Sequence, residues 1–200
     1  MLHRVFVSYH HANDQDYKNE LVKWAEKNDI FIDWSVDTGD ISDDLTDQQI
    51  REIIRDEYLR DSSVTIVLVG TETKNRKHVD WEIYSSMYDG KINKKSGIIV
   101  INLPSINCTS FHSSHYDEKS LVFPECSDWV TITNRAEFNS RYPYMPERIV
   151  DNLIRPDVKI SIINWNQLTP IKLKYMIQKA FEDKTTCEYD LSTPMRRRDS

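Results

Sequence analysis

One glutamate in this 200-residue sequence lies in a pattern that could hold a carboxylate beside a cleft. Val79, Ile83 and Met87 recur at helical spacing and predict the buried stripe of a helix. Glu82 comes one position before Ile83, so it borders that stripe and could lean toward neighbouring strand ends. Such a carboxylate could stabilise positive charge that develops on a bound substrate during a reaction. A solvated surface residue is the alternative, because most helical glutamates are exposed.

Two neighbouring features bear on the charge of Glu82. The residue is close to the predicted N-terminus of its helix, where the helix dipole favours the ionised form by roughly 0.3 to 1 kcal/mol. His78 comes four residues earlier on the same helix face and could contact the carboxylate. An exposed His–Glu pair is the alternative interpretation of this spacing.

Strand and helix patterns alternate along the chain. The expected strands are short runs rich in β-branched and aromatic residues, at 4–9, 30–34, 63–70, 97–102 and 128–132. The run at 63–70 is almost unbroken apolar sequence, so we expect it at the centre of a sheet that helices cover on both faces. Strands joined by single helices need right-handed crossovers, and five of them commonly adopt the order 2-1-3-4-5. The sequence therefore predicts a flavodoxin-like α/β fold with a doubly wound parallel sheet.

The remaining residues predict a long loop, one further helix and a tail. Residues 103–125 are mostly polar, and loops of this length usually border a functional site or a partner surface. A Thr-Pro pair at 169–170 predicts the start of a helix that runs through Phe181. Residues 184–200 carry few apolar groups and include three consecutive arginines. We expect them to be a flexible tail after a single domain spanning 1–183.

Composition and charge limit the class of protein. Hydrophobic residues make up 39% and charged residues 29%, which suits a folded domain with a solvated surface. The net charge is -6 and no basic stripe is present, so nucleic acid is not an expected partner. The first residues lead into a strand pattern and no run reaches spanning length, so we expect a cytoplasmic protein without a membrane partner. The three cysteines are widely spaced, which predicts reduced thiols without a zinc site.

The sequence does not contain the residues that several kinds of nucleotide-binding and phosphate-transfer site require. The chain has four glycines, none in the spacing of a dinucleotide-binding or P-loop turn. A phosphoacceptor receiver domain needs paired acids after the first strand and an aspartate ending the third. This chain has Ser-Tyr-His and Val-Gly-Thr at those places. His112 and His115 could ligate a metal, but no further ligand pair follows at suitable spacing, so we predict no metal site.

Two segments carry a resemblance to a known family. The first is Arg4-Val-Phe-Val-Ser-Tyr-His10, and the second runs from Val67 to Ile83 as a strand, a Gly-x-x-Thr turn, a basic residue and a Val-x-aromatic-Glu-Ile helix. This arrangement resembles the TIR-like domains of the Thoeris ThsB family over about half of the chain. The chain departs from the family in carrying His78 where a tryptophan usually precedes the valine. That departure changes the expected wall of the pocket.

The resemblance implies an enzyme that breaks the nicotinamide–ribose bond of NAD+, with Glu82 matching the family's catalytic glutamate. It also implies a role in antiphage defence, in which a cyclic ADP-ribose isomer activates a separate effector protein. NAD+ would be the substrate, and no cofactor is expected. The residues agree with this chemistry, because a pyridinium leaving group needs no general acid and one carboxylate can suffice.

The other candidate residues follow from where ligands bind in doubly wound sheets. Ligands collect at the carboxyl ends of the strands where the strand order reverses, here between the first and third strands. Tyr9 or Trp34 could stack on a base. Lys74 or Arg76 could bind a phosphate, and Asn102 could point a donor into the same cleft. The candidate substrate-binding residues are Ser8, Tyr9, His10, Trp34, Thr71, Thr73, Lys74, Arg76, His78 and Asn102.

Two other functions stay open from the sequence. TIR-like domains can also act as non-enzymatic interaction modules through homotypic assembly, and the fold alone does not separate these roles. A nucleoside deoxyribosyltransferase-like enzyme is a third possibility, because it shares a glutamate beside a flavodoxin-like cleft. A homo-oligomer is compatible with the first two functions.

Overall fold

The computed structural model describes residues 2–35, 41–42, 44–90 and 93–199. Within these ranges five parallel strands form one sheet in the order β2-β1-β3-β4-β5, which confirms the predicted topology. The strands are β1 (Arg4–Ser8), β2 (Ile32–Asp33), β3 (Val64–Val69), β4 (Gly97–Asn102) and β5 (Ile160–Asn164). Every residue of β3, β4 and β5 is buried, because helices cover both faces of the sheet.

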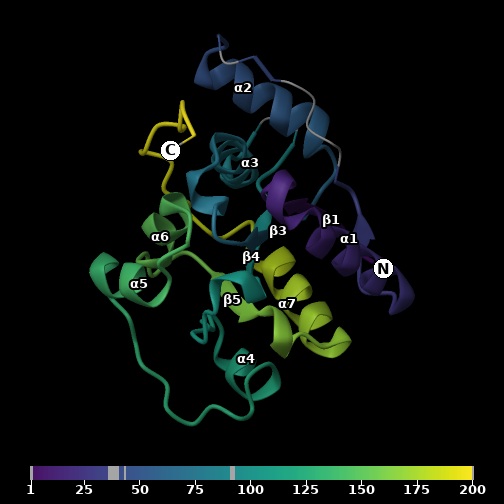
Figure 1. The fold of residues 1–200 in the computed structure, drawn as a ribbon, viewed down its shortest axis with the longest axis vertical. Coiled ribbons are helices and arrows are strands. Elements are labelled where there is room, and N and C mark those ends of the chain that lie inside the picture. The colour runs from purple at the N-terminus through teal and green to yellow at the C-terminus, as the bar shows by residue number, and fades with distance from the viewer. Residues whose placement is uncertain (1, 36–40, 43, 91–92, 200) are drawn as a thin grey trace.

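Helices lie on both sides of this sheet (Figure 1). In the described part of the chain they are α1 (His11–Lys27), α2 (Asp47–Ile53), α3 (Lys77–Met87), α4 (Tyr116–Leu121), α5 (Arg135–Arg141), α6 (Glu147–Leu153) and α7 (Pro170–Asp183). A π-helical turn, Ile54–Tyr58, continues α2. Short 3-10 turns follow three of the strands: Thr73–Asn75 after β3, Pro104–Ile106 after β4 and Trp165–Gln167 after β5. Helices α1 and α7 pack on one face of the sheet, and α3, α5 and α6 pack on the other.

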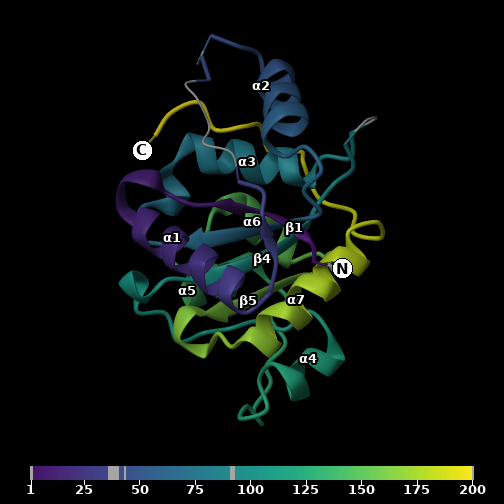
Figure 2. The same cartoon turned by 90° about the vertical axis from the view of Figure 1, so that its right-hand side faces the viewer.

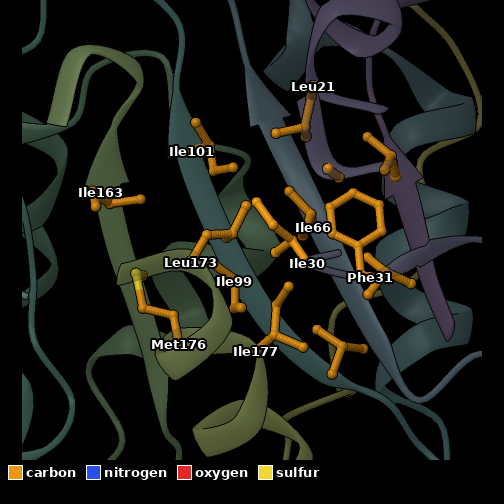
Figure 3. Close-up of a cluster of buried hydrophobic side chains, with 14 of the residues drawn as sticks. Leu21, Ile30, Phe31, Ile66, Ile99, Ile101, Ile163, Leu173, Met176 and Ile177 are labelled. Atoms are coloured by element: carbon orange, nitrogen blue, oxygen red, sulfur yellow. The ribbon is translucent and has the colours of Figure 1, made fainter. Parts of the chain in front are cut away.

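Alternate strand residues build the core under α1 and α7. Ile66 and Ile99, from the two central strands, lie in one buried cluster with Leu21 of α1 (Figure 3). Leu173 and Ile177 of α7 complete this part of the cluster. Side chains two residues apart on a strand point to the same face, so the remaining strand residues supply the opposite core.

The opposite core contains the predicted stripe of α3. Val79, Ile83 and Met87 are all buried, and they pack with Val67 of β3 and Val100 of β4. The helical spacing in the sequence is therefore confirmed as the face that α3 presents to the sheet. This packing fixes the rotation of α3 about its own axis, and with it the direction of every other side chain on the helix.

The predicted fifth strand is wrong. Residues 128–132 form no strand, and Val130 is exposed. The position beside β4 belongs to Ile160–Asn164, which pairs with β4 in parallel register. The aromatic content that suggested a strand has a local role instead, because Trp129 packs edge-on against Phe123.

The polar segment 103–125 has more structure than a plain loop. It contains the 3-10 turn Pro104–Ile106 and helix α4. Glu118 of α4 is fully buried, and its Oε2 accepts a hydrogen bond of 2.6 Å from Ser161 Oγ of β5. This bond ties the segment to the edge of the sheet.

The C-terminal residues 184–199 differ from the flexible tail that we expected. Cys187 and Met195 are buried. The side chain of Asn152 in α6 binds the backbone of Asp190, donating to its carbonyl oxygen and accepting from its N–H at 2.7 Å. A segment with few apolar residues can therefore pack firmly, because buried polar side chains satisfy its backbone, and composition alone does not reveal this.

The described residues contain no group of three His, Cys, Asp or Glu side chains that could hold a metal ion. Cys108, Cys126 and Cys187 are free thiols. The ring of His112 packs edge-on against Phe138, and burial lowers the pKa of this histidine to about 4. As for membranes, none of the helices in the described ranges combines the length and the apolar character that crossing a bilayer requires.

Gly97 begins β4 at a point where α7 passes close to the sheet. A Cβ at this position would overlap the backbone carbonyl of Ala180, so either the strand or the helix would have to move. We predict that Gly97→Ala lowers the free energy of unfolding by about 1 to 3 kcal/mol. Lys174→Ala, on the exposed side of the same helix, should change it by less than about 0.5 kcal/mol. Urea denaturation measures both values, and equal effects of the two variants would contradict this close approach.

Candidate active site

Helix α3 directs one side chain toward the end of β1. The buried stripe on the helix faces the sheet, and Trp81 on a second side packs in a cluster with Phe6 of β1. Glu82 lies between these two packed sides, so it is shielded from solvent and is only 3% exposed. Its placement therefore follows from the apolar residues on both sides of it in the sequence.

Ser8 is the partner that meets Glu82. It ends β1, it is 0% exposed, and its Oγ donates a hydrogen bond of 2.6 Å to Oε2 of Glu82. Ser8 is in register with Val67 of β3, at the place where the strand order of the sheet reverses. In α/β sheets of this type, ligands bind at that place, outside the carboxyl ends of the strands. The structure thus brings the predicted catalytic residue and one predicted binding residue into direct contact.

The electrostatics of Glu82 differ from the sequence-based expectation. Burial raises the pKa of its carboxyl group from 4.5 to about 8, although the hydrogen bond from Ser8 acts in the opposite direction. At neutral pH the protonated form therefore predominates. The small preference for the ionised form that we expected from the helix dipole is outweighed, because removing a carboxylate from water costs more than the dipole contributes.

The two residues after Ser8 take different directions. Tyr9 is buried in the core under α1 and α7, where its hydroxyl donates to Oε1 of Gln15 at 2.7 Å. Its ring stacks on His11 at a centroid distance of 4.4 Å. Tyr9 therefore packs on the sheet face opposite to α3. His10 lies near Arg76 and Asp199, and burial followed by the charge of Arg76 lowers its pKa.

The turn after β3 uses its predicted binding residues for several local contacts. Thr73 is buried, and its Oγ accepts from the N–H of Gly70 at 2.8 Å and so closes the turn. Lys74 Nζ donates to the carbonyl oxygen of Pro143 at 2.6 Å. Thr71 is half-buried in the same turn. These contacts give the turn its shape and direct Lys74 toward the start of α6.

Arg76 and His78 remain close to the N-terminal end of α3. The guanidinium of Arg76 lies 3.5 Å from a carboxylate oxygen of Glu72 and 3.5 Å from one of Asp199. His78 packs edge-on against Trp81 at a centroid distance of 4.9 Å. Of the predicted phosphate-binding cations, Arg76 is therefore the one beside the helix that carries Glu82.

Trp34 and Asn102 lie at other places on the sheet. The ring of Trp34 lies under the guanidinium of Arg4, at 4.3 Å from its centroid. Asn102 ends β4, and its Nδ2 donates to Oδ1 of Asn164 at 3.0 Å. Both asparagines line a cavity of about 390 Å³ that is walled by Trp165. Asn164 was missed because the fifth strand was assigned to the wrong residues.

The sequence carries no signal for an ion pair that lies beside Glu82, between the half-buried Asp80 and the buried Arg148. Asp80 Oδ1 accepts from Nε of Arg148 at 2.8 Å, and Asp80 Oδ2 accepts from Nη2 of the same arginine at 3.0 Å. The partners are 68 residues apart, and no periodic pattern links residues across such a distance. This pair ties α3 to α6 two residues before Glu82.

Comparison with protein families identifies the domain that holds this site. The model of the TIR-like domain of Thoeris protein ThsB matches residues 6–107, just over half of the chain. The chain belongs to this family. The matched ThsB region runs from β1 past the end of β4 and includes both Ser8 and Glu82. Membership in the ThsB family supports a role in antiphage defence. A search of curated proteins finds no match.

The raised pKa of Glu82 predicts a particular dependence of stability on pH. The folded chain keeps a proton on Glu82 up to about pH 8, whereas the unfolded chain loses it near 4.5. Folding stability should therefore fall as pH rises through this window, by up to about 1.4 kcal/mol per pH unit. Glu82→Gln removes this contribution, so the variant should gain stability relative to the unmodified protein as pH increases.

Urea denaturation at several pH values across that window measures the difference between the two proteins. The exposed Glu57, changed to glutamine, is the matched control and should show a constant difference. If the Glu82→Gln difference were also independent of pH, the carboxyl group would not carry the raised pKa.

Proposed function

We propose that this TIR-like domain breaks the nicotinamide–ribose bond of NAD+ and that Glu82 is its catalytic carboxylate. The observation that carries this proposal is the buried Glu82 carboxyl held by Ser8 at the reversal point of the sheet. The family match supports it, because both residues fall inside the matched region. A strongly perturbed carboxyl at a ligand-binding place of the fold is a recognised sign of a functional site.

The reaction needs only one carboxylate. The bond between the ribose C1′ and the pyridinium nitrogen breaks, and its electron pair leaves with neutral nicotinamide. Positive charge develops on C1′ and the ring oxygen of the ribose, and an adjacent Glu82 carboxylate stabilises that charge. Water then attacks C1′ to give ADP-ribose and a proton, or a nucleophile within the same molecule attacks to give a cyclic product and a proton.

Substrate binding supplies the charge state that this reaction requires. The nicotinamide ring of NAD+ is cationic, and a positive charge next to a carboxyl group lowers the pKa of that group. A Glu82 that is protonated in the unliganded domain therefore loses its proton as the pyridinium arrives. The buried surroundings strengthen the attraction between carboxylate and developing cation, because less water screens them.

The proposal extends to the signal that follows cleavage. In a ThsB-type defence system, the product would be a cyclic ADP-ribose-type nucleotide that diffuses to a separate effector protein. NAD+ is then consumed as a substrate and no cofactor takes part. This role requires the domain to work in the cytoplasm, where its substrate is present.

A non-enzymatic interaction module is the second candidate, and exposed apolar side chains favour it. Tyr116 and Leu121 of α4 are exposed, and so is Ile171 at the start of α7. Apolar residues on adjacent elements can contact another protein or a second copy of the chain. Under this alternative, Glu82→Gln would leave antiphage activity in cells intact.

Glu82→Gln separates the two candidates directly. We expect nicotinamide release in phage-challenged cells to fall by about 100-fold or more, which is the usual effect of removing a charge-stabilising group. Glu57→Gln, which changes an exposed glutamate, should release nicotinamide like the unmodified protein. Mass spectrometry of nicotinamide and ADP-ribose products provides the measurement. Equal release by both variants would exclude Glu82 as the catalytic group.

The pKa of Glu82 also predicts the pH profile of the enzyme. The reaction needs the ionised carboxylate, so kcat/KM for NAD+ should rise with pH and level off above about 8. Ser8→Ala removes a donor to the carboxylate, so its rise should be displaced to higher pH. Initial rates of nicotinamide release across this range test the profile. A kcat/KM that stays constant through the range would contradict catalysis by the ionised form of Glu82.

A further inference from the structure

The proposed chemistry requires contact between substrate and two side chains that are buried in the structure. Ser8 is 0% exposed and Glu82 is 3% exposed. A ribose can reach them only if a covering element moves. Contacts that hold the N-terminal end of α3 in place would therefore control access to Ser8 and Glu82.

Residues 193–199 make those contacts. Figure 2 shows the yellow C-terminal segment running beside α2 and α3 after it leaves α7. Nη1 of Arg148 donates to the carbonyl oxygen of Thr193 at 2.9 Å, and Nη2 donates to that of Pro194 at 3.1 Å. The same arginine is paired with Asp80 of α3, so one buried guanidinium joins the segment to this helix.

Two further bonds hold the residues that directly precede Glu82. The backbone N–H of Arg196 donates to Oδ2 of Asp80 at 2.8 Å, and its carbonyl oxygen accepts from Nε1 of Trp81 at 2.7 Å. Met195 is buried in the cluster that contains Trp81. The segment thus binds both residues that precede Glu82 in sequence.

Asp199 occupies the N-terminal end of α3. Its Oδ1 accepts a hydrogen bond of 2.8 Å from the N–H of Lys77, the first residue of the helix, and its Oδ2 lies 3.5 Å from Nη1 of Arg76. Burial acts to raise the pKa of Asp199, but the Lys77 N–H and the Arg76 charge outweigh it and leave the pKa below its usual value. A helix N–H and a guanidinium are also groups that can hold a phosphate, so Asp199 lies at a position suited to an anion.

We propose that residues 193–199 are an autoinhibitory strap, in which the Asp199 carboxylate competes with the pyrophosphate of a dinucleotide for Arg76 and the N–H of Lys77. The identity of the dinucleotide rests on the proposed function. In the docked state the strap holds α3 against the end of β1, so that Ser8 and Glu82 stay buried between the helix and the strand. Binding of the anionic ligand displaces Asp199, releases the Asp199 end of the strap from α3 and opens the path to Glu82.

The contacts along the strap differ in how readily they can be displaced. The side chain of Asp199 is 41% exposed, so water and salt weaken its ion pair with Arg76. Arg148 is buried and carries hydrogen bonds to four acceptors in Asp80, Thr193 and Pro194. The strap should therefore detach from the Asp199 end while Arg148 keeps its other end attached.

Binding of ADP-ribose to the full chain tests the competition without requiring catalysis. In a Glu82→Gln background, Asp199→Asn should tighten the dissociation constant for ADP-ribose by about three- to tenfold, because it removes the competing charge. Asp128→Asn, in an exposed loop, removes the same charge elsewhere and is the matched control. Isothermal titration calorimetry gives both constants. Equal affinities of the two variants would overturn the proposal.

Limited trypsin digestion gives an independent test of strap release. Trypsin cuts after the arginines at 196–198, and docking should slow this cut in the unliganded protein. ADP-ribose, or the Asp199→Asn change alone, should accelerate the loss of the final residues as detected by intact mass. A cut rate that neither change alters would show that the strap stays docked and would overturn the proposal.

These outcomes are distinct from failure of the proposed function. If Asp199→Asn tightens ADP-ribose binding but the unmodified protein never releases nicotinamide, the strap proposal is supported and the proposal of NAD+ cleavage is refuted. If the unmodified and Asp199→Asn proteins release nicotinamide at the same rate and bind ADP-ribose equally well, NAD+ cleavage is supported and the strap proposal is refuted.

Discussion

The hydrogen bond between Ser8 and Glu82 is the interaction on which the rest of the site depends. It joins the end of β1 to the middle of α3, and both side chains are buried. A buried carboxyl group without partners would be costly, and the cost is reduced here in two ways. The group is protonated over most of the physiological range, and the serine hydroxyl satisfies one of its oxygens. The folded domain therefore keeps the carboxyl group of Glu82 in its neutral, protonated form.

Under the proposed function, this arrangement would link NAD+ cleavage to an opening of the domain. A neutral Glu82 cannot stabilise an oxocarbenium ion, and a buried Glu82 cannot touch a ribose. Both obstacles have the same origin, since the packing that closes α3 over β1 also excludes the water that would ionise the carboxyl group. The segment around Arg196 contacts α3 at the residues before Glu82, so movement of that segment would change access and ionisation together. Under the proposed function, the closed domain would be inactive although Glu82 itself is unchanged.

The sequence predicts the parts of this structure that depend on local periodicity. The stripe of Val79, Ile83 and Met87 sets the rotation of α3, and the apolar runs of β3 and β4 indicate a sheet covered on both faces. The helix that begins at Pro170 is likewise confirmed, with Thr169 accepting from Lys172 N–H as its cap.

The predictions that the structure contradicts depend on interactions between residues that are far apart in the sequence. Residues 128–132 have strand-like composition, but Trp129 belongs to a local aromatic cluster, and pairing with β4 selects Ile160–Asn164 instead. The C-terminal segment is polar, and its docking depends on a guanidinium in α6 that no local pattern connects to it. The protonated state of Glu82 also comes from tertiary burial, which the position of a residue in its helix does not reveal.

In the proposed function, Glu82 acts on the ribose of a nicotinamide dinucleotide beside Ser8. An experimental structure of Glu82→Gln bound to NAD+ tests this contact, because the variant cannot consume its ligand if Glu82 is the catalytic group. In that structure we expect C1′ of the nicotinamide ribose to lie in contact with the side chain at position 82, with α3 displaced from the end of β1. A dinucleotide bound only in the cavity between Asn102 and Asn164, with position 82 still covered, would contradict the proposed function.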